Sequence, residues 1–221
     1  RDGKGSGIIR NKMSVSKAFR NYTENLESVG VLHSGAFQLS AMNFEIDVSE
    51  FYRGELVLLV SAFDTYIHDV IADITTERLM STKLWKKNLI CKYGISRSLS
   101  KTIRNEPDKD KRRQMFRIEL LKKLQEKTFQ KSSAIAIIFS KNGIPNIWEV
   151  VSGYLHEEVT ITTKKIDSIV RERNKIAHES HIDPRTGKKF SMTEKQIEEK
   201  RNYLLEIVKG IEYAIDTRKA Q

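Results

Sequence analysis

The sequence has few of the residues that cross-link a chain or interrupt its helices. It holds one cysteine, three prolines and 11 glycines among 221 residues. A single cysteine, Cys91, excludes an internal disulfide and any zinc site built on several cysteines, which favours a reducing, cytoplasmic compartment. So few prolines and glycines disfavour an all-β sandwich or barrel with many turns and favour long helices. We therefore expect an all-α protein.

Long hydrophobic runs are also absent. The longest, residues 56–60 and 134–139, are far shorter than the roughly 18 residues that a membrane-spanning helix requires. Residues 1–13 lack the apolar segment of a signal peptide, and we interpret them as a flexible N-terminal segment or a vector remnant. We expect the rest of the chain, residues 14–221, to form one domain.

Charge of one sign dominates a single stretch of the chain. The net charge is +10, and residues 83–131 hold 16 Lys and Arg against five Asp and Glu. A local positive excess is typical of a surface that binds a polyanion, because neutralised phosphates release counterions. Two alternatives are a solvated helix surface and a membrane surface, although the stretch lacks the aromatic face of an interfacial helix. The candidate RNA-binding residues are Lys109, Lys111, Arg112, Arg113, Arg117, Lys122 and Lys123.

Apolar residues at spacings of three and four predict the helices. The first is expected over residues 14–30, interrupted by Gly30 and Gly35, and the second over residues 49–80, apolar on most sides and central to the core. Residues 84–106 are expected to form a short helix and then a polar loop. Pro107-Asp108 should break the chain before a helix over residues 110–130.

The second half of the chain follows the same pattern. We expect a short apolar element after Ser132, a short helix capped by Asn146, and a longer helix from Thr162 or Thr163 to just after His178. Residues 191–194 resemble a capping box that opens the last helix. The sequence thus predicts a bundle of four main helices with short accessory helices, and no strand.

The common catalytic and nucleotide-binding motifs are missing. Residues 3–7 do not have the spacing of a phosphate-binding loop, and Cys91 has no context that indicates a nucleophile. His178, His181 and Asp183 could form a metal site on paper, but no further ligand lies at helical spacing to close it. We therefore predict no metal and no cofactor.

One run, residues 171–179, carries the groups needed to cleave RNA without a metal. His178 can move the proton of a ribose 2′-hydroxyl or of the leaving oxygen, because histidine titrates near neutral pH. Arginine presents a fork of donors to phosphate oxygens and stabilises charge in the transition state. Asn174 can orient either group. A solvated helix end with an incidental histidine is the alternative.

Helical geometry divides these residues between two faces. At about 100° per residue, Arg171, Asn174 and His178 fall within about 60° of one another. Arg173 lies about 140° from His178, nearer the apolar stripe of the helix. We expect Arg173 to be buried or pressed against another helix and to need an acidic or amide partner. Asp64 and Glu55 on the second helix are the candidates.

The run Arg173-Asn174-Lys175-Ile176-Ala177-His178 resembles the motif of the HEPN superfamily, in which an arginine and a polar residue precede a histidine. Residues 53–67 and 147–184 are similar to its RiboL-PSP branch. The resemblance covers residues 14–215. It implies a helical bundle that forms a homodimer with both motifs in one cleft, and metal-independent cleavage through a 2′,3′-cyclic phosphate.

The resemblance implies roles for the motif residues, with His178 moving protons, Arg173 binding phosphate and Asn174 orienting; Arg171 and Asp64 are supporting candidates. Whether Arg171 or Arg173 is the catalytic arginine stays open. The main hypothesis is an endoribonuclease that acts on tRNA or mRNA as a toxin or phage-defence effector. The alternative is an inactive helical module that dimerises or binds RNA or protein. A cognate antitoxin or defence-system protein is a possible partner of either.

Overall fold

The computed structural model describes residues 16–42, 47–82 and 93–219. These residues form eight α-helices, and their only β pairing is an isolated bridge between Ile182 and Lys189. The expectation of an all-α fold is therefore confirmed. None of the described helices is long and apolar enough to cross a membrane. The predicted N-terminal segment, residues 1–13, lies outside the described residues.

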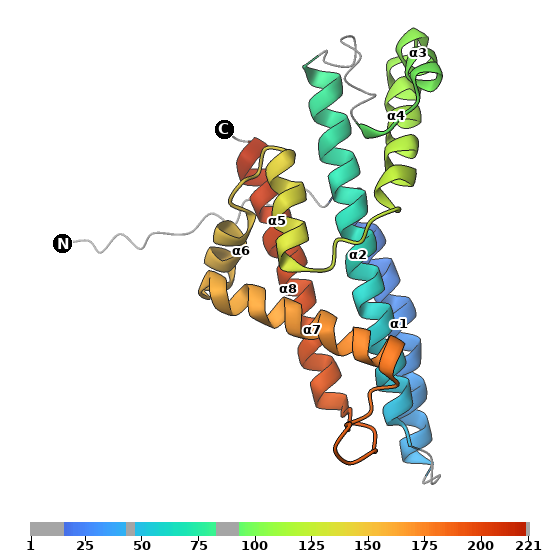
Figure 1. Ribbon diagram of the computed structural model, residues 1–221, viewed down its shortest axis with the longest axis vertical. Coiled ribbons are helices and arrows are strands. Elements are labelled where there is room, and N and C mark those ends of the chain that lie inside the picture. Colours follow the sequence, from blue (N-terminus) through green and yellow to red (C-terminus); the bar gives the residue numbers. More distant parts are fainter. Residues whose placement is uncertain (1–15, 43–46, 83–92, 220–221) are drawn as a thin grey trace, which may run out of the picture.

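The helix α2 (Ser49–Ser81) forms the axis of the bundle. It begins and ends where the apolar pattern predicts, and its buried residues lie on most sides of the helix. The helices α1 (Lys17–Ala41), α4 (Lys109–Leu124), α5 (Ser132–Lys141), α7 (Val159–Glu179) and α8 (Glu194–Lys219) all contact it (Figure 1). The remaining helices, α3 (Arg97–Asn105) and α6 (Ile147–Leu155), pack against α4 and α8, respectively.

The first helix is longer than predicted. α1 continues through Gly30 and Gly35 to Ala41, so the expected interruption is wrong. A glycine inside a helix costs only about 1 kcal/mol relative to alanine. Val29 and Ala36 are buried among the core residues, and we attribute the continuation to this packing.

The fourth helix is shorter than predicted, because tertiary hydrogen bonds replace helical ones after Leu124. The Nε2 atom of His68 lies 3.1 Å from the carbonyl oxygen of Leu124 and 3.0 Å from that of Lys127. Asp64 accepts the backbone N–H of Phe129 at 2.8 Å. The predicted loop before Pro107 is also wrong in part, since residues 97–105 form α3.

Two helix starts differ in detail. α7 begins at Val159, three or four residues before the expected start at Thr162 or Thr163. The capping box of α8 is formed by Thr193 and Gln196: the Thr193 N–H donates to the Gln196 side chain at 2.9 Å, and the Gln196 N–H donates to the Thr193 hydroxyl at 3.3 Å. Asn146 occupies the N-cap position of α6 as expected, but its side chain makes no capping bond.

Candidate active site at the end of α7

The helix α7 crosses the bundle and brings its last turns against α2 (Figure 1). It ends because Ser180 and His181 adopt left-handed conformations, with φ of 53° and 56°. The His181 N–H donates to the carbonyl oxygen of Lys175 at 3.0 Å. Two consecutive left-handed residues other than glycine are costly, and such strain collects at functional sites.

The loop that follows α7 is held in place by Arg53 of α2. The Arg53 side chain is 4% exposed, and its Nη2 donates to the carbonyl oxygen of Phe190 at 2.7 Å. The Phe190 N–H donates in turn to the carbonyl oxygen of His181 at 2.9 Å. Burial lowers the pKa of His181, whose ring packs on Phe190 with a centroid distance of 5.2 Å. The C-terminal end of α7 is thus held through Phe190, which bonds to Arg53 and packs against His181.

The predicted polar face of α7 is open to solvent. Arg171 and His178 are exposed and Asn174 is half-buried. Asn174 and His178 are four residues apart, which makes them neighbours on adjacent helical turns. None of the three side chains hydrogen-bonds to a residue that the structure describes. The side chains that could move a proton or orient a substrate are therefore available to contact a bound substrate.

Arg173 is half-buried and faces the interior side of α7, as its helical position predicts. Its Nη2 donates to the side-chain oxygen of Gln130. The Gln130 amide donates to Asp64 at 3.1 Å. Asp64, an expected direct partner of Arg173, therefore reaches it only through Gln130. The Arg173 Nε atom is buried and has no partner among the described residues.

Glu55, the other candidate partner of Arg173, has a different role. Its side chain is fully buried, accepts a hydrogen bond from Arg201, and lies 3.2 Å from the His33 Nδ1 atom. The expectation of a contact with Arg173 was therefore wrong. Glu55 joins α1, α2 and α8 instead.

Gln130 was not found by sequence reasoning. It lies 43 residues before Arg173, in the segment that the apolar pattern assigned to a helix. A neutral amide satisfies one guanidinium N–H without cancelling the positive charge, which a carboxylate would do. Arg173 can therefore present a charged group to a phosphate. No sequence signal marks Gln130, because only the folded chain brings it to Arg173.

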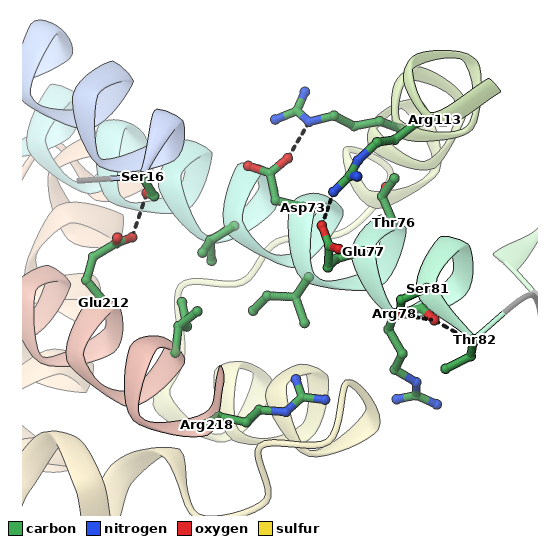
Figure 2. Close-up of a pocket in the computed structure, with 14 residues that line it drawn as sticks. Ser16, Asp73, Thr76, Glu77, Arg78, Ser81, Thr82, Arg113, Glu212 and Arg218 are labelled. Carbon is green, nitrogen blue, oxygen red and sulfur yellow. Dashed lines mark hydrogen bonds and ion pairs between the residues drawn. The ribbon is translucent and has the colours of Figure 1, made fainter. Parts of the chain in front are cut away.

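The basic residues of α4 are placed differently. Arg117 donates to Asp69 at 2.9 Å and also contacts Asp73. Arg113 contacts Glu77 (Figure 2). Burial alone would lower the pKa of Arg117, but these carboxylates outweigh it and raise the pKa. The other pairs join Lys111 to Glu106, Lys122 to Glu119 and Lys123 to Glu126, while Arg112 donates to the carbonyl oxygens of Glu106 and Pro107.

Lys109 alone of the seven candidate cations forms no hydrogen bond or ion pair with a described residue. The segment 83–92, which contributes part of the predicted charge, lies outside the described residues. Arg113 and Arg117 direct their charged groups toward carboxylates of α2.

A group of potential metal-ligating side chains lies on α1 and the start of α8. Within the described ranges, the one such group is His33, Glu194 and Glu198. The His33 Nε2 atom lies 3.3 Å from Glu194, and Nδ1 faces Glu55, so ion pairs and hydrogen bonds account for the arrangement.

Asp183, which the sequence offered as a metal ligand on paper, bonds to Arg185. This bond lowers the pKa of the Asp183 carboxyl group.

The helical bundle and the motif at the end of α7 define a HEPN-type domain. The model of the RiboL-PSP-HEPN family matches residues 31–217. The chain therefore belongs to the RiboL-PSP-HEPN family. Comparisons with curated proteins and with solved structures gave no significant match.

Proposed function

We propose that this protein is a metal-independent endoribonuclease whose active site lies at the end of α7 and includes Arg173, Asn174 and His178. The observation that supports the proposal is the state of Arg173: it is positioned by the neutral Gln130 amide, while Asn174 and His178 carry no other bond among the described residues. His178 accepts the 2′-hydroxyl proton or donates one to the leaving 5′-oxygen. Arg173 stabilises the charge on the phosphate.

The expected products follow from this chemistry. Attack by the 2′-oxygen on the neighbouring phosphorus forms a 2′,3′-cyclic phosphate as the bond to the 5′-oxygen breaks. The proton leaves the 2′-hydroxyl and a proton reaches the 5′-oxygen, so the second fragment begins with a 5′-hydroxyl. No metal is needed for either transfer.

The exposed position of the motif also favours a homodimer as the active form. A single copy leaves Arg171 and His178 open to water, whereas closing a site against solvent strengthens its electrostatic interactions. We propose that a second copy covers this end of α7 and brings two motifs to one cleft. A role as a toxin or phage-defence effector on tRNA or mRNA, held in check by an antitoxin or defence-system partner, remains part of the same proposal, as does a cytoplasmic location.

The test compares purified wild-type protein with His178→Ala on total tRNA and a structured mRNA in excess EDTA. The wild type should cut RNA and His178→Ala should not, with both retaining the same helical circular dichroism. His156→Asn is the matched control, since His156 is exposed and left-handed, a conformation that asparagine tolerates. Cleavage that persists in His178→Ala would overturn the proposal.

The second candidate function is an inactive module that dimerises or binds RNA or protein. The ion pairs of α4 do not favour RNA binding by such a module, because they involve five of the seven predicted RNA-binding cations. A gel assay separates the two functions: a binding module shifts RNA without changing its length, and its affinity falls with added salt.

A further inference from the structure

The connection between α4 and α5 carries Gln130 to Arg173. It comprises residues 125–131 and passes across α2 (Figure 1). Residues 125–128 are exposed and belong to no helix. Among the described residues, the one hydrogen-bond partner of the Arg173 side chain is Gln130. Because arginine has many rotamers, the place of this partner decides where the guanidinium lies.

His68 of α2 holds the beginning of the connection. The residue is only 7% exposed. Its Nε2 atom lies 3.1 Å from the carbonyl oxygen of Leu124 and 3.0 Å from that of Lys127. A carbonyl oxygen only accepts hydrogen bonds, so Nε2 is the donor here. The His68 ring also packs on the buried ring of Phe129, with a centroid distance of 4.9 Å. His68 thus fixes the chain on both sides of the exposed residues.

Asp64 holds the end of the connection from the same face of α2, since residues four apart on a helix are neighbours. Its carboxylate accepts the Phe129 N–H at 2.8 Å and the Gln130 amide at 3.1 Å. The Nδ1 atom of His68 lies 2.6 Å from the carbonyl oxygen of Asp64. Two neighbouring side chains therefore set the place of Gln130 relative to α2.

The helix that carries Arg173 is tied to the same frame. Arg53 of α2 binds the loop that follows α7. Asp167 of α7 accepts the Ser132 N–H at 2.8 Å and the Ser132 hydroxyl at 2.9 Å, two residues after Gln130. α2 thus positions both α7 and the segment that holds the partner of Arg173. A misplacement of about 1 Å at a reacting group can cost about 100-fold in rate.

We propose that His68 is a positioning residue for RNA cleavage. Through the backbone of residues 124–129 it keeps Gln130, and with it Arg173, in the place that the reaction requires. The proposal rests on the proposed nuclease function, in which Arg173 stabilises the charge on the phosphate. A histidine that only stabilised the fold would change the free energy of unfolding and leave the cleavage rate of the folded protein unchanged.

Substitutions of His68 separate these roles by the kinetics of cleavage. His68→Leu removes both ring nitrogens and should lower kcat by about tenfold or more, because a displaced Arg173 stabilises the transition state less well. KM should change by less than about threefold, since the lost interaction acts in the transition state. His68→Gln restores a donor toward the two carbonyl oxygens and should keep kcat within about threefold of the wild type.

Thr75→Val is the matched control. Thr75 is also buried on α2, and its hydroxyl donates to the Asn142 side chain at 2.6 Å. The substitution removes a buried tertiary hydrogen bond of the same helix but leaves the contacts of Gln130 in place. Thr75→Val should therefore lower the urea midpoint, as His68→Leu does, and leave kcat unchanged.

A second readout does not depend on cleavage. Protein with isotope-labelled arginine gives a side-chain NMR signal for Arg173, which is assigned by its loss in Arg173→Lys. This signal should shift in His68→Leu, because the bond to Gln130 changes, and should keep its wild-type position in Thr75→Val. If the wild type cuts no RNA, the nuclease proposal fails, and the NMR comparison alone decides whether His68 positions Arg173.

An unchanged Arg173 signal in His68→Leu would overturn the proposal. So would an equal loss of kcat in His68→Leu and Thr75→Val, which would assign the loss to stability. If His68→Leu does not fold, His68→Asn carries the same predictions. Its shorter amide reaches the carbonyl oxygen of Asp64 but not those of Leu124 and Lys127.

Discussion

Arginines of α4 and α7 make opposite use of the same side chain. In α4, Arg117 bridges to Asp69 and Asp73 of α2, so its charge is cancelled and contributes to packing. In α7, Arg173 is held by the neutral Gln130, which positions the guanidinium and leaves its charge uncancelled. Local charge density is therefore a weak guide to function. The partner of each charge decides whether it can bind a substrate.

The largest effect is expected at the α7 arginine. Arg173→Ala should lower RNA cleavage by about 100-fold or more, because a charged donor to the transition state is lost. Arg171→Ala should have a smaller effect, since no hydrogen bond or ion pair with a described residue positions Arg171. Initial rates of single-turnover cleavage, measured for both variants, check the order. The reverse order would identify Arg171 as the catalytic arginine.

Substitution of the paired cations of α4 should lower the stability of the fold and leave RNA cleavage unchanged. Arg117→Ala should lower the free energy of unfolding by about 1–3 kcal/mol, because it leaves Asp69 and Asp73 without their cation. Lys122→Ala should cost less than about 1 kcal/mol, since its pair with Glu119 is largely exposed. Urea unfolding followed by circular dichroism measures both. A drop in cleavage by folded Arg117→Ala would contradict the assignment of α4 to packing.

Gln130→Glu gives Arg173 a carboxylate partner in place of a neutral amide, as Arg117 of α4 has. A carboxylate at this position should cancel the Arg173 charge and also lose the bond that the Gln130 amide donates to Asp64, so we expect kcat to fall by about tenfold. Gln125→Glu adds the same charge at an exposed site after α4 and serves as the control. If Gln130→Glu cleaves RNA at the wild-type rate, the neutral partner of Arg173 has no functional importance.

The smallest effect concerns a buried carboxyl group, that of Glu212, which forms no ion pair within the described ranges. Glu212 accepts hydrogen bonds from Tyr66 and Ser16, both at 2.8 Å, and burial raises its pKa. The folded protein keeps this proton to a higher pH than the unfolded chain, so the contribution to stability is complete below the unfolded pKa of about 4.3. It decreases as the pH rises through the raised value.

Glu212→Gln should therefore increase the urea midpoint at pH 7 and change it little at pH 4. Exposed Glu199→Gln is the control and should show no such pH dependence. A midpoint for Glu212→Gln that falls at pH 7 would show that the ionised carboxylate stabilises the fold.

The fold was largely predictable because its main helices carry long apolar periods. α2 has the expected bounds to within one residue at its end, and α7 ends where the turn signals after His178 place it. The failures have local causes. Gly30 stays helical although glycine weakens helices, and α4 ends early because His68 and Asp64 bind the backbone that follows it.

The candidate site was predictable only in part. Helical spacing correctly placed Arg173 away from the exposed face of Arg171 and His178. It could not supply the identity of the partner, because Gln130 reaches Arg173 through tertiary structure and belongs to no motif. Asp64 was expected as a direct partner and instead bonds to Gln130.

The central claim is that the end of α7 cleaves RNA by the 2′-hydroxyl route without a metal. Analysis of the fragment ends after incubation of tRNA with wild-type protein in excess EDTA tests it most directly. We expect 2′,3′-cyclic phosphate and 5′-hydroxyl ends, both absent with His178→Ala. Fragments that end in a 3′-hydroxyl and a 5′-phosphate, or cleavage that EDTA abolishes, would contradict it.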